Sequence, residues 1–232
     1  MTIPSAAPHP LDHVIWSALT TRHAPLAQGS PLAWRYPPEV APFAALANRS
    51  EAAFESLHAL MQPGERAVLF TVDAVEVPAQ FTTLLEKFGE QMIATSYTPA
   101  AAVAEHLTLG PTDVTEMRAL VALTRPGPFK ERTIELGRYI GRRQDGQLVA
   151  MAGERMNIDG FTEVSAICTH PDHRGHGHAA ALTDVIARGI LARGDTPFLH
   201  VWADNASAIA LYHKLGFRIR RTMHVTAVAR AG

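Results

Sequence analysis

The sequence predicts an α/β protein built on a mixed α+β sheet. Three observations lead to this prediction. Strand-like and helical patterns alternate along most of the chain, no segment repeats at the period of a solenoid, and no tract is of low complexity. A hydrophobic content of 47%, with 16 Gly and 16 Pro, is typical of a globular protein. Strands that are joined in sequence by helices belong to a mixed sheet whose faces carry the helices.

Length and charge exclude several classes of protein. The 232 residues suffice for one large domain or two small ones. Lys and Arg number 21 against 22 Asp and Glu, so a net charge of -1 offers no basic excess to neutralise a phosphate backbone. We therefore expect no nucleic-acid partner. Apolar runs such as residues 100–104 fall short of the ~20 residues that cross a bilayer, so we also expect no membrane segment.

The N-terminus and the cysteine content favour the cytoplasm. Residues 1–10 lack the cationic start and the apolar core of a secretory signal. A single cysteine, Cys168, excludes an intrachain disulfide. We therefore expect a cytoplasmic protein.

Regular patterns in the first half begin after residue 48, because closely spaced prolines interrupt the sequence before it. Ser50 is placed to cap a helix with apolar residues at helical spacing, and Pro63-Gly64 stops that helix. The segments that follow predict a strand over 67–72, a helix over 79–88 and two strands near 91–97 and 103–109.

The chain restarts near residue 110 with a second series of elements. Asp113 and Glu116 form a capping-box pair that predicts a helix start. The Asp145-Gly146 dipeptide predicts the turn of a hairpin. The remaining expected elements are strands over 138–144, 147–155, 163–170 and 197–203, helices over 179–193 and 206–215, and a terminal strand pair within 217–228. In the strand over 163–170, simple alternation places Glu163 and Cys168 on opposite faces.

A glycine-containing loop lies between the strand over 163–170 and the next helix. Gly175 and Gly177 lack Cβ atoms, so a ligand can approach successive backbone N–H groups closely. These donors and the positive end of the helix dipole suit a pyrophosphate, and Arg174 adds a permanent positive charge.

Three interpretations of this loop compete. A tight turn that needs glycines is the simplest. Gly175-x-Gly177-x-x-Ala180 also loosely matches a dinucleotide site, although residues 171–174 separate it from its strand. A metal site would use the clustered histidines, which are His170, His173, His176 and His178. Only Asp172 accompanies them, so we expect no metal.

Two segments resemble the GNAT superfamily of acyl-CoA-dependent N-acyltransferases. The family signature Arg/Gln-x-x-Gly-x-Gly/Ala after a strand ending in His/Asn-Pro is matched in residues 167–179. A second family element, Asn-x-x-Ala followed by Leu-Tyr and Leu-Gly-Phe, is matched in residues 205–217. The resemblance covers about residues 112–228 and implies a GNAT fold there. It predicts a catalytic domain over 111–232, preceded by a smaller αβ accessory half over 1–110, because some relatives carry an eroded second copy of the fold at that place.

The resemblance implies a cofactor site between two strands that separate. Main-chain groups of Ile167, Cys168 and Thr169 would bind the pantetheine arm, and one of their N–H groups would face the thioester oxygen. The pyrophosphate would contact the loop and the helix start, which comprise Arg174, Gly175, His176, Gly177, His178, Ala179 and Ala180. Asn205 would cap its helix, touch the cofactor, or do both.

Catalytic roles follow from the same resemblance. Tyr212 lies seven residues after Asn205 and therefore on the same face of the helix. The resemblance implies that Tyr212 protonates the departing thiolate. The alternative is that Tyr212 packs under the sheet. The base would be Glu163, His200 or a chain of waters, and partial burial would raise the pKa of Glu163 toward neutrality. A solvated carboxylate and a core histidine are the alternatives. Cys168 lacks an evident activating partner and is expected to be a small buried residue.

We therefore expect an N-acetyltransferase that transfers an acetyl group from acetyl-CoA to a primary amine of a small molecule or peptide by direct attack. A non-catalytic acyl-CoA sensor and a Rossmann-type NAD-binding oxidoreductase are the alternatives. In the first half, Trp16, Trp34 and Tyr36 are candidates to line the acceptor side or to pack in the core.

Overall fold

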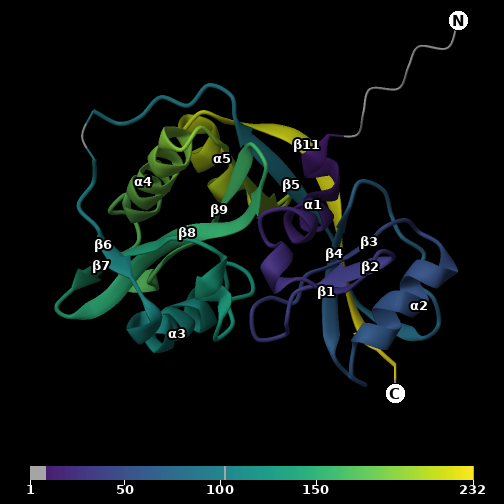
Figure 1. Cartoon of the computed structure of the whole chain (residues 1–232). Helices are drawn as coiled ribbons and strands as arrows, with labels where there is room; N and C mark the ends of the chain where they lie inside the picture. The colour runs from purple at the N-terminus through teal and green to yellow at the C-terminus, as the bar shows by residue number, and fades with distance from the viewer. Residues whose placement is uncertain (1–8, 102, 232) are drawn as a thin grey trace, which may run out of the picture.

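One mixed sheet organises the computed structural model, which describes residues 9–101 and 103–231 (Figure 1). Eight strands of this part of the chain form it in the order β4-β11-β5-β10-β9-β8-β7-β6. Their bounds are β4 Arg66–Thr71, β5 Phe81–Ala94, β6 Leu107–Leu109, β7 Tyr139–Gln144, β8 Gln147–Ile158, β9 Phe161–Thr169, β10 Thr196–Trp202 and β11 Phe217–Arg230. The predicted α/β class with a mixed sheet is confirmed.

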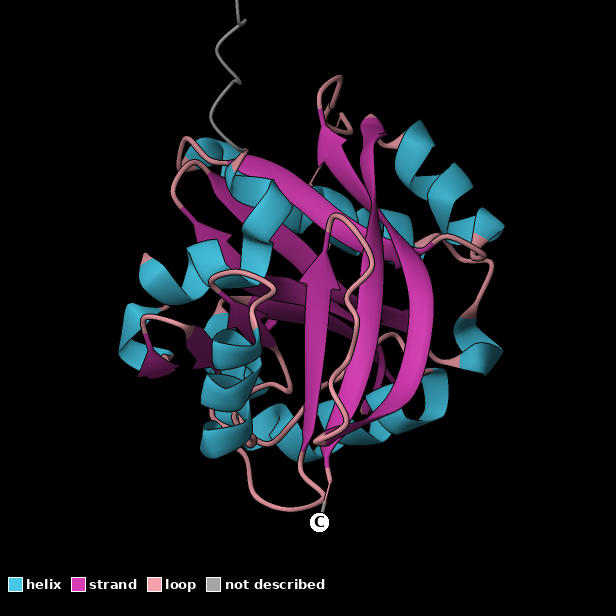
Figure 2. Cartoon of the chain, turned by 90° about the vertical axis from the view of Figure 1, so that its right-hand side faces the viewer, coloured by secondary structure: helices cyan, strands magenta, loops and turns pink. Residues whose placement is uncertain are grey.

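Helices cover both faces of this sheet (Figures 1 and 2). The helices α4 (His178–Ala192) and α5 (Ala206–Lys214) pack on one face, around a core that includes Val164 and Leu199. The helices α1 (Val14–Thr20) and α3 (Val114–Thr124) lie on the other face. A small antiparallel sheet packs against helix α2, and these elements are β1 (Gln28–Ser30), β2 (Ala33–Arg35), β3 (Ala44–Leu46) and α2 (Glu51–Leu60).

Local signals in the sequence set several of these elements. The Ser50 hydroxyl accepts a hydrogen bond from the Ala53 N–H and so caps α2, as predicted. Asp145 and Gly146 have φ angles of 50° and 82°, which are the values that a type I′ hairpin turn needs between β7 and β8. Both predictions are confirmed.

The helix predicted over 79–88 is wrong, because that segment is the first part of β5. Strand β5 pairs with β11 from Phe81↔Arg230 to Ala94↔Phe217, so long-range pairing overrides the local pattern. Its second part accounts for the strand predicted near 91–97. The terminal strand pair predicted within 217–228 is also wrong, because β11 is one strand with a bulge between Ile219 and Arg221. In the segment predicted as a strand over 103–109, only Leu107–Leu109 forms one.

The capping box predicted for Asp113 and Glu116 is not formed. The Asp113 carboxylate instead accepts the Gly110 N–H at 2.8 Å, and a 3₁₀ turn over Pro111–Asp113 precedes α3. Asp113 and Glu116 both bind Arg143, so these acidic residues tie the start of α3 to the β7–β8 hairpin.

A bulge in β9 changes which residues share a face. Ala166 has a φ of 52°, and the register jumps from Gly153↔Ser165 to Met151↔Cys168. Because the bulge adds one residue to β9, Glu163 and Cys168 lie on the same side of the sheet, toward α1 and α3. The alternation predicted for this strand is therefore wrong.

Strands β9 and β10 separate after a short parallel contact, as expected. Their pairing ends at Phe198↔Glu163, although β9 continues to Thr169 and β10 to Trp202. Beyond that point β10 stays paired with β5 down to Trp202↔Gly89. Since β4 and β5 join the same sheet, residues before 110 contribute directly to it, and the predicted division of the chain near residue 110 stays a prediction.

Candidate active site

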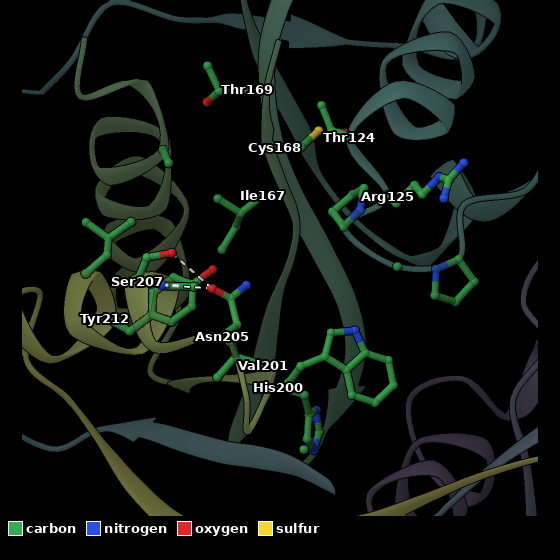
Figure 3. Close-up of a pocket in the computed structure, with 18 of the residues that line it drawn as sticks. Thr124, Arg125, Ile167, Cys168, Thr169, His200, Val201, Asn205, Ser207 and Tyr212 are labelled. Atoms are coloured by element: carbon green, nitrogen blue, oxygen red, sulfur yellow. Dashed lines mark hydrogen bonds between the residues drawn. The ribbon is translucent and has the colours of Figure 1, made fainter. Parts of the chain in front are cut away.

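A cavity of about 670 Å³ opens where β9 and β10 separate (Figure 3). Most of the predicted site residues line it, and these are Ile167, Cys168, Thr169, Arg174, Gly175, Gly177, His178, Ala179, Ala180, His200, Asn205 and Tyr212. Glu163 and His176 are not among its lining residues. The structure thus brings together side chains from β9, β10, α5 and the loop before α4.

Backbone geometry explains the glycines of the loop. Gly175 and Gly177 have φ angles of 82° and 74°, in the region that non-glycine residues rarely adopt. An added Cβ would meet no atom within 4 Å at either position, so the loop faces open space. Helix α4 begins immediately afterwards at His178. Its first backbone N–H groups therefore point toward this end of the cavity, where Arg174 is exposed.

The histidines of the loop do not converge. Arg142 donates to Nδ1 of His178 at 3.1 Å, so the Nε2 of His178 carries the proton when the ring is neutral. Burial, followed by the nearby positive charges of Arg142, His176 and His173, lowers the pKa of His178 and favours that neutral form. Among the described residues, no group of three or more His, Cys, Asp or Glu is arranged to hold a metal ion.

Helix α5 presents Asn205 and Tyr212 to the cavity. The Asn205 side chain accepts the Ala208 N–H and the Ser207 hydroxyl, both at 3.1 Å, which makes it the N-cap of α5 (Figure 3). Tyr212 lines the cavity, and burial raises the pKa of its hydroxyl to about 12. The phenol therefore stays protonated at neutral pH and is able to donate a proton.

Glu163 forms a buried ion pair with Arg155, which itself lines the cavity. The Arg155 Nε and Nη2 donate to its two carboxylate oxygens at 2.7 and 2.6 Å, and the His200 Nδ1 lies 2.7 Å from Oε1. Glu163 is fully buried. Burial alone would raise the pKa of Glu163, but the Arg155 charge and hydrogen bonds outweigh it and hold the pKa at about 2. The predicted rise toward neutrality is wrong, because the partner in the ion pair could not be seen in the local sequence.

A glutamine determines the protonation of His200. The Gln91 Nε2 donates to the Leu11 carbonyl at 2.9 Å and lies 3.1 Å from the His200 Nε2, while its Oε1 accepts from Arg220 at 2.8 Å. Because the amide nitrogen faces His200, the His200 Nε2 must accept and its Nδ1–H donates to Glu163. Both ring nitrogens of His200 are thus hydrogen-bonded.

Cys168 is buried, as expected. Burial raises the pKa of its thiol to about 11, so it is not a nucleophile at neutral pH. The neighbouring Thr169 lines the cavity. Its hydroxyl oxygen is buried and has no hydrogen-bond partner among the described residues.

The sequence did not reveal the aromatic wall of the cavity, which Phe43, Phe70 and Trp202 form. Phe43 reaches it through an isolated bridge to Val68, a contact that no local pattern signals. The residues proposed instead lie elsewhere. Trp34 and Tyr36 belong to the core beside α1. Trp16 lines a second hollow of about 310 Å³.

Comparisons with known proteins agree with this fold. Residues 139–225 match the family described as FR47-like protein. The crystal structure of a GNAT-family protein from Novosphingobium aromaticivorans superposes with a TM-score of 0.91 at 40% identity, over 97% of this chain and 100% of that one. The ribosomal protein bS18 alanine N-acetyltransferase of Escherichia coli is 34% identical over 112 residues, which is 44% of this chain and 75% of that protein.

A third similar protein matches this chain over only part of its length. The mycothiol acetyltransferase of Streptomyces avermitilis is 33% identical over 88 residues, so the match spans 37% of this chain and only 28% of that enzyme. The fold is that of GNAT-family proteins. The chain belongs to the GNAT superfamily of N-acetyltransferases. No helix in the described residues is both long and apolar enough to span a bilayer.

Proposed function

We propose that this protein transfers an acetyl group from acetyl-CoA to a primary amine by direct attack of the amine on the thioester. The observation that carries the proposal is the continuous cavity between β9 and β10. One end meets the glycine loop and the start of α4, and Tyr212 lines the same cavity. A site for the anionic end of the cosubstrate and a proton donor for its sulfur are thereby joined.

The residues present fit acetyl-CoA. Backbone N–H groups at the start of α4, the Arg174 guanidinium and the Nε2–H of His178 are donors suited to a pyrophosphate. Thr169 lines the same cavity, and its buried hydroxyl has no hydrogen-bond partner among the described residues. Main-chain groups of 167–169 face the gap, because β10 has left β9 at that point. When bound there, the cosubstrate would supply the activated acetyl group.

The proposed roles of the chain follow from these positions. A β9 main-chain N–H polarises the thioester carbonyl, which is worth about 3 kcal/mol in a comparable oxyanion site. Tyr212 donates its phenolic proton to the sulfur that leaves, since its raised pKa keeps it protonated. Glu163 holds His200 and is not itself a base. Both ring nitrogens of His200 already form hydrogen bonds, to Gln91 and Glu163. We therefore propose that the amine loses its proton to water in the cavity.

The N-terminal half contributes the acceptor side in this proposal. Phe43, Phe70 and Leu85 come from the accessory half predicted over 1–110, and all three line the cavity. A catalytic half over 111–232 would then hold the cosubstrate while the first half shapes the space for the amine.

Two measurements on the purified protein test the function. Acetyl-CoA is expected to raise the melting temperature and NAD to leave it unchanged; the reverse would point to an NAD-binding oxidoreductase instead. Release of free CoA thiol over a panel of amines is expected to depend on the amine. Stabilisation by acetyl-CoA without thiol release from any amine would contradict catalysis and indicate an acyl-CoA sensor.

A further inference from the structure

The wall of the cavity away from the glycine loop is mostly apolar, apart from Arg155, whose guanidinium carbon lies 4.7 Å from the Phe43 ring centroid. The apolar residues of this wall lie on neighbouring strands and in the segment before β3, and they are Phe43, Val68, Phe70, Leu85, Trp202, Val225 and Ala227. Strand register places Val225 opposite Phe70, and places Ala227 between Val68 and Leu85. They therefore form one continuous patch, which we call the apolar wall.

Aromatic rings make up the inner part of the apolar wall. Phe70 packs edge-on against Phe43, with ring centroids 5.6 Å apart, and against His200 at 4.8 Å. Aromatic edges and faces in this arrangement pack well against another planar or aliphatic group. A ligand group of that kind would bury surface here without needing a polar partner.

Charges around the apolar wall do not suit a cation. None of the described residues that line the cavity is acidic. Glu163 is fully buried and bound to Arg155. The Lys87 ammonium lies 5.2 Å from the Trp202 ring centroid and adds a positive charge, which Asp204 offsets at 2.8 Å. An acceptor held as a cation would thus lose its hydration without gaining a counter-charge.

The hydrogen bonds of the possible bases also argue against an acceptor that is held as a cation. The His200 Nε2 accepts from Gln91, and the Glu163 carboxylate has a strong ion-pair partner. Neither group is poised to take a proton from an ammonium. A strongly basic amine, with a pKa near 10.4 like lysine, would rarely be neutral in this site, whereas an α-amine, with a pKa of about 8, would often be.

We infer that the acceptor is a weakly basic amine attached to an apolar group of about aromatic size. The inference rests on the proposed acetyltransferase function. The amine nitrogen forms the bond to the acetyl carbon, the carbon–sulfur bond breaks, and its electron pair leaves with sulfur. Sulfur takes the proton of Tyr212, and the nitrogen loses one proton to water, from which Tyr212 is reprotonated. An amine that enters neutral therefore needs no base beforehand.

Two amines with the same aromatic group separate basicity from shape. Phenylalanine amide and phenethylamine both carry a benzyl group, but the α-amine of the amide is far less basic. We expect kcat/KM at pH 7, measured as thiol release, to be at least about tenfold higher for the amide. Spermidine, which is a polycation, is expected to be the poorest of the three. A preference for spermidine, or equal values for the two benzyl amines, would overturn the inference.

A pair of variants tests whether the apolar wall meets the acceptor. Leu85 lines the cavity and Leu84 does not, and both are already exposed, at 38% and 44%. In Leu85→Glu, the new carboxylate is expected to raise kcat/KM for spermidine relative to phenylalanine amide by about tenfold. Leu84→Glu is expected to leave that ratio unchanged. An unchanged ratio in Leu85→Glu would overturn the assignment of this wall to the acceptor.

Failure of the proposed function has a different signature. In that case no amine of either kind would release thiol from acetyl-CoA, in the native protein or in either variant. Failure of the inference alone leaves thiol release intact and changes only the order of the amines.

Discussion

The Nε2 atoms of Gln91 and His200 lie 3.1 Å apart, and the hydrogen bonds of Gln91 to Leu11 and Arg220 make its nitrogen the donor. A protonated His200 would place an N–H against this amide N–H₂. The glutamine therefore makes the His200 Nε2 an acceptor, and the Nδ1 donates to the Glu163 carboxylate, 2.7 Å away.

The first prediction concerns this tautomer. Nitrogen-15 NMR at pH 7 is expected to show the His200 proton on Nδ1 and none on Nε2. Gln91→Glu replaces the amide donor with a carboxylate, which only accepts, so a proton is expected on Nε2 in this variant and the nitrogen-15 shift of Nε2 is expected to change. A doubly protonated ring in the native protein at pH 7 would contradict the assignment.

Removal of the Glu163 carboxylate is expected to destabilise the protein. Glu163→Gln leaves the Arg155 guanidinium buried without a counter-charge, which typically costs about 3–5 kcal/mol. Denaturant unfolding measures the loss. If Glu163 were instead the base, Glu163→Gln would abolish activity while leaving the free energy of unfolding nearly unchanged.

The same ion pair predicts how stability depends on pH. The pKa of Glu163 is about 2 in the folded protein and near 4.5 for an unperturbed glutamate. Its contribution is therefore fully present above about pH 5 and is lost as the pH falls toward 2. Unfolding free energies measured from pH 6 to pH 3 are expected to fall more steeply for the native protein than for Glu163→Gln. Parallel curves would rule out this linkage.

Tyr212→Phe tests the proton donor. Loss of the hydroxyl is expected to lower kcat by about 10²-fold, because the thiolate must leave without a proton. Stabilisation by acetyl-CoA is expected to persist, since the ring still packs against Phe217. Native-like turnover would assign Tyr212 to the core alone.

Glycine geometry in the loop allows a matched comparison. Gly177 (φ 74°) and Gly160 (φ 79°) have similar backbones with open space around an added Cβ, but only Gly177 lines the cavity. Alanine at either position is expected to cost about 1–2 kcal/mol of stability. Only Gly177→Ala is expected to weaken acetyl-CoA binding, by about tenfold in Kd measured by calorimetry. Equal effects of the two variants on binding would contradict a role for the loop.

Elements with local signals were predictable from the sequence. The loop at 174–180 and the start of α4 follow from glycines between a strand and a helix, and Asn205 caps α5 through an oxygen three residues before its partner. The family, and the end of the cavity that we assign to the cosubstrate, could therefore be predicted from residues that are close together in the chain.

Tertiary structure decided the rest, because the partners are distant in sequence. Residues 79–88 look helical alone but are held as a strand by β11, more than a hundred residues away. The pKa of Glu163 depends on Arg155 in the neighbouring strand, and the state of His200 depends on Gln91. The apolar wall joins Phe43 and Phe70 to Trp202 in the same way. The sequence by itself thus determined the family, whereas packing between remote segments determined the ion pair of Glu163, the hydrogen bonds of His200 and the residues that line the cavity.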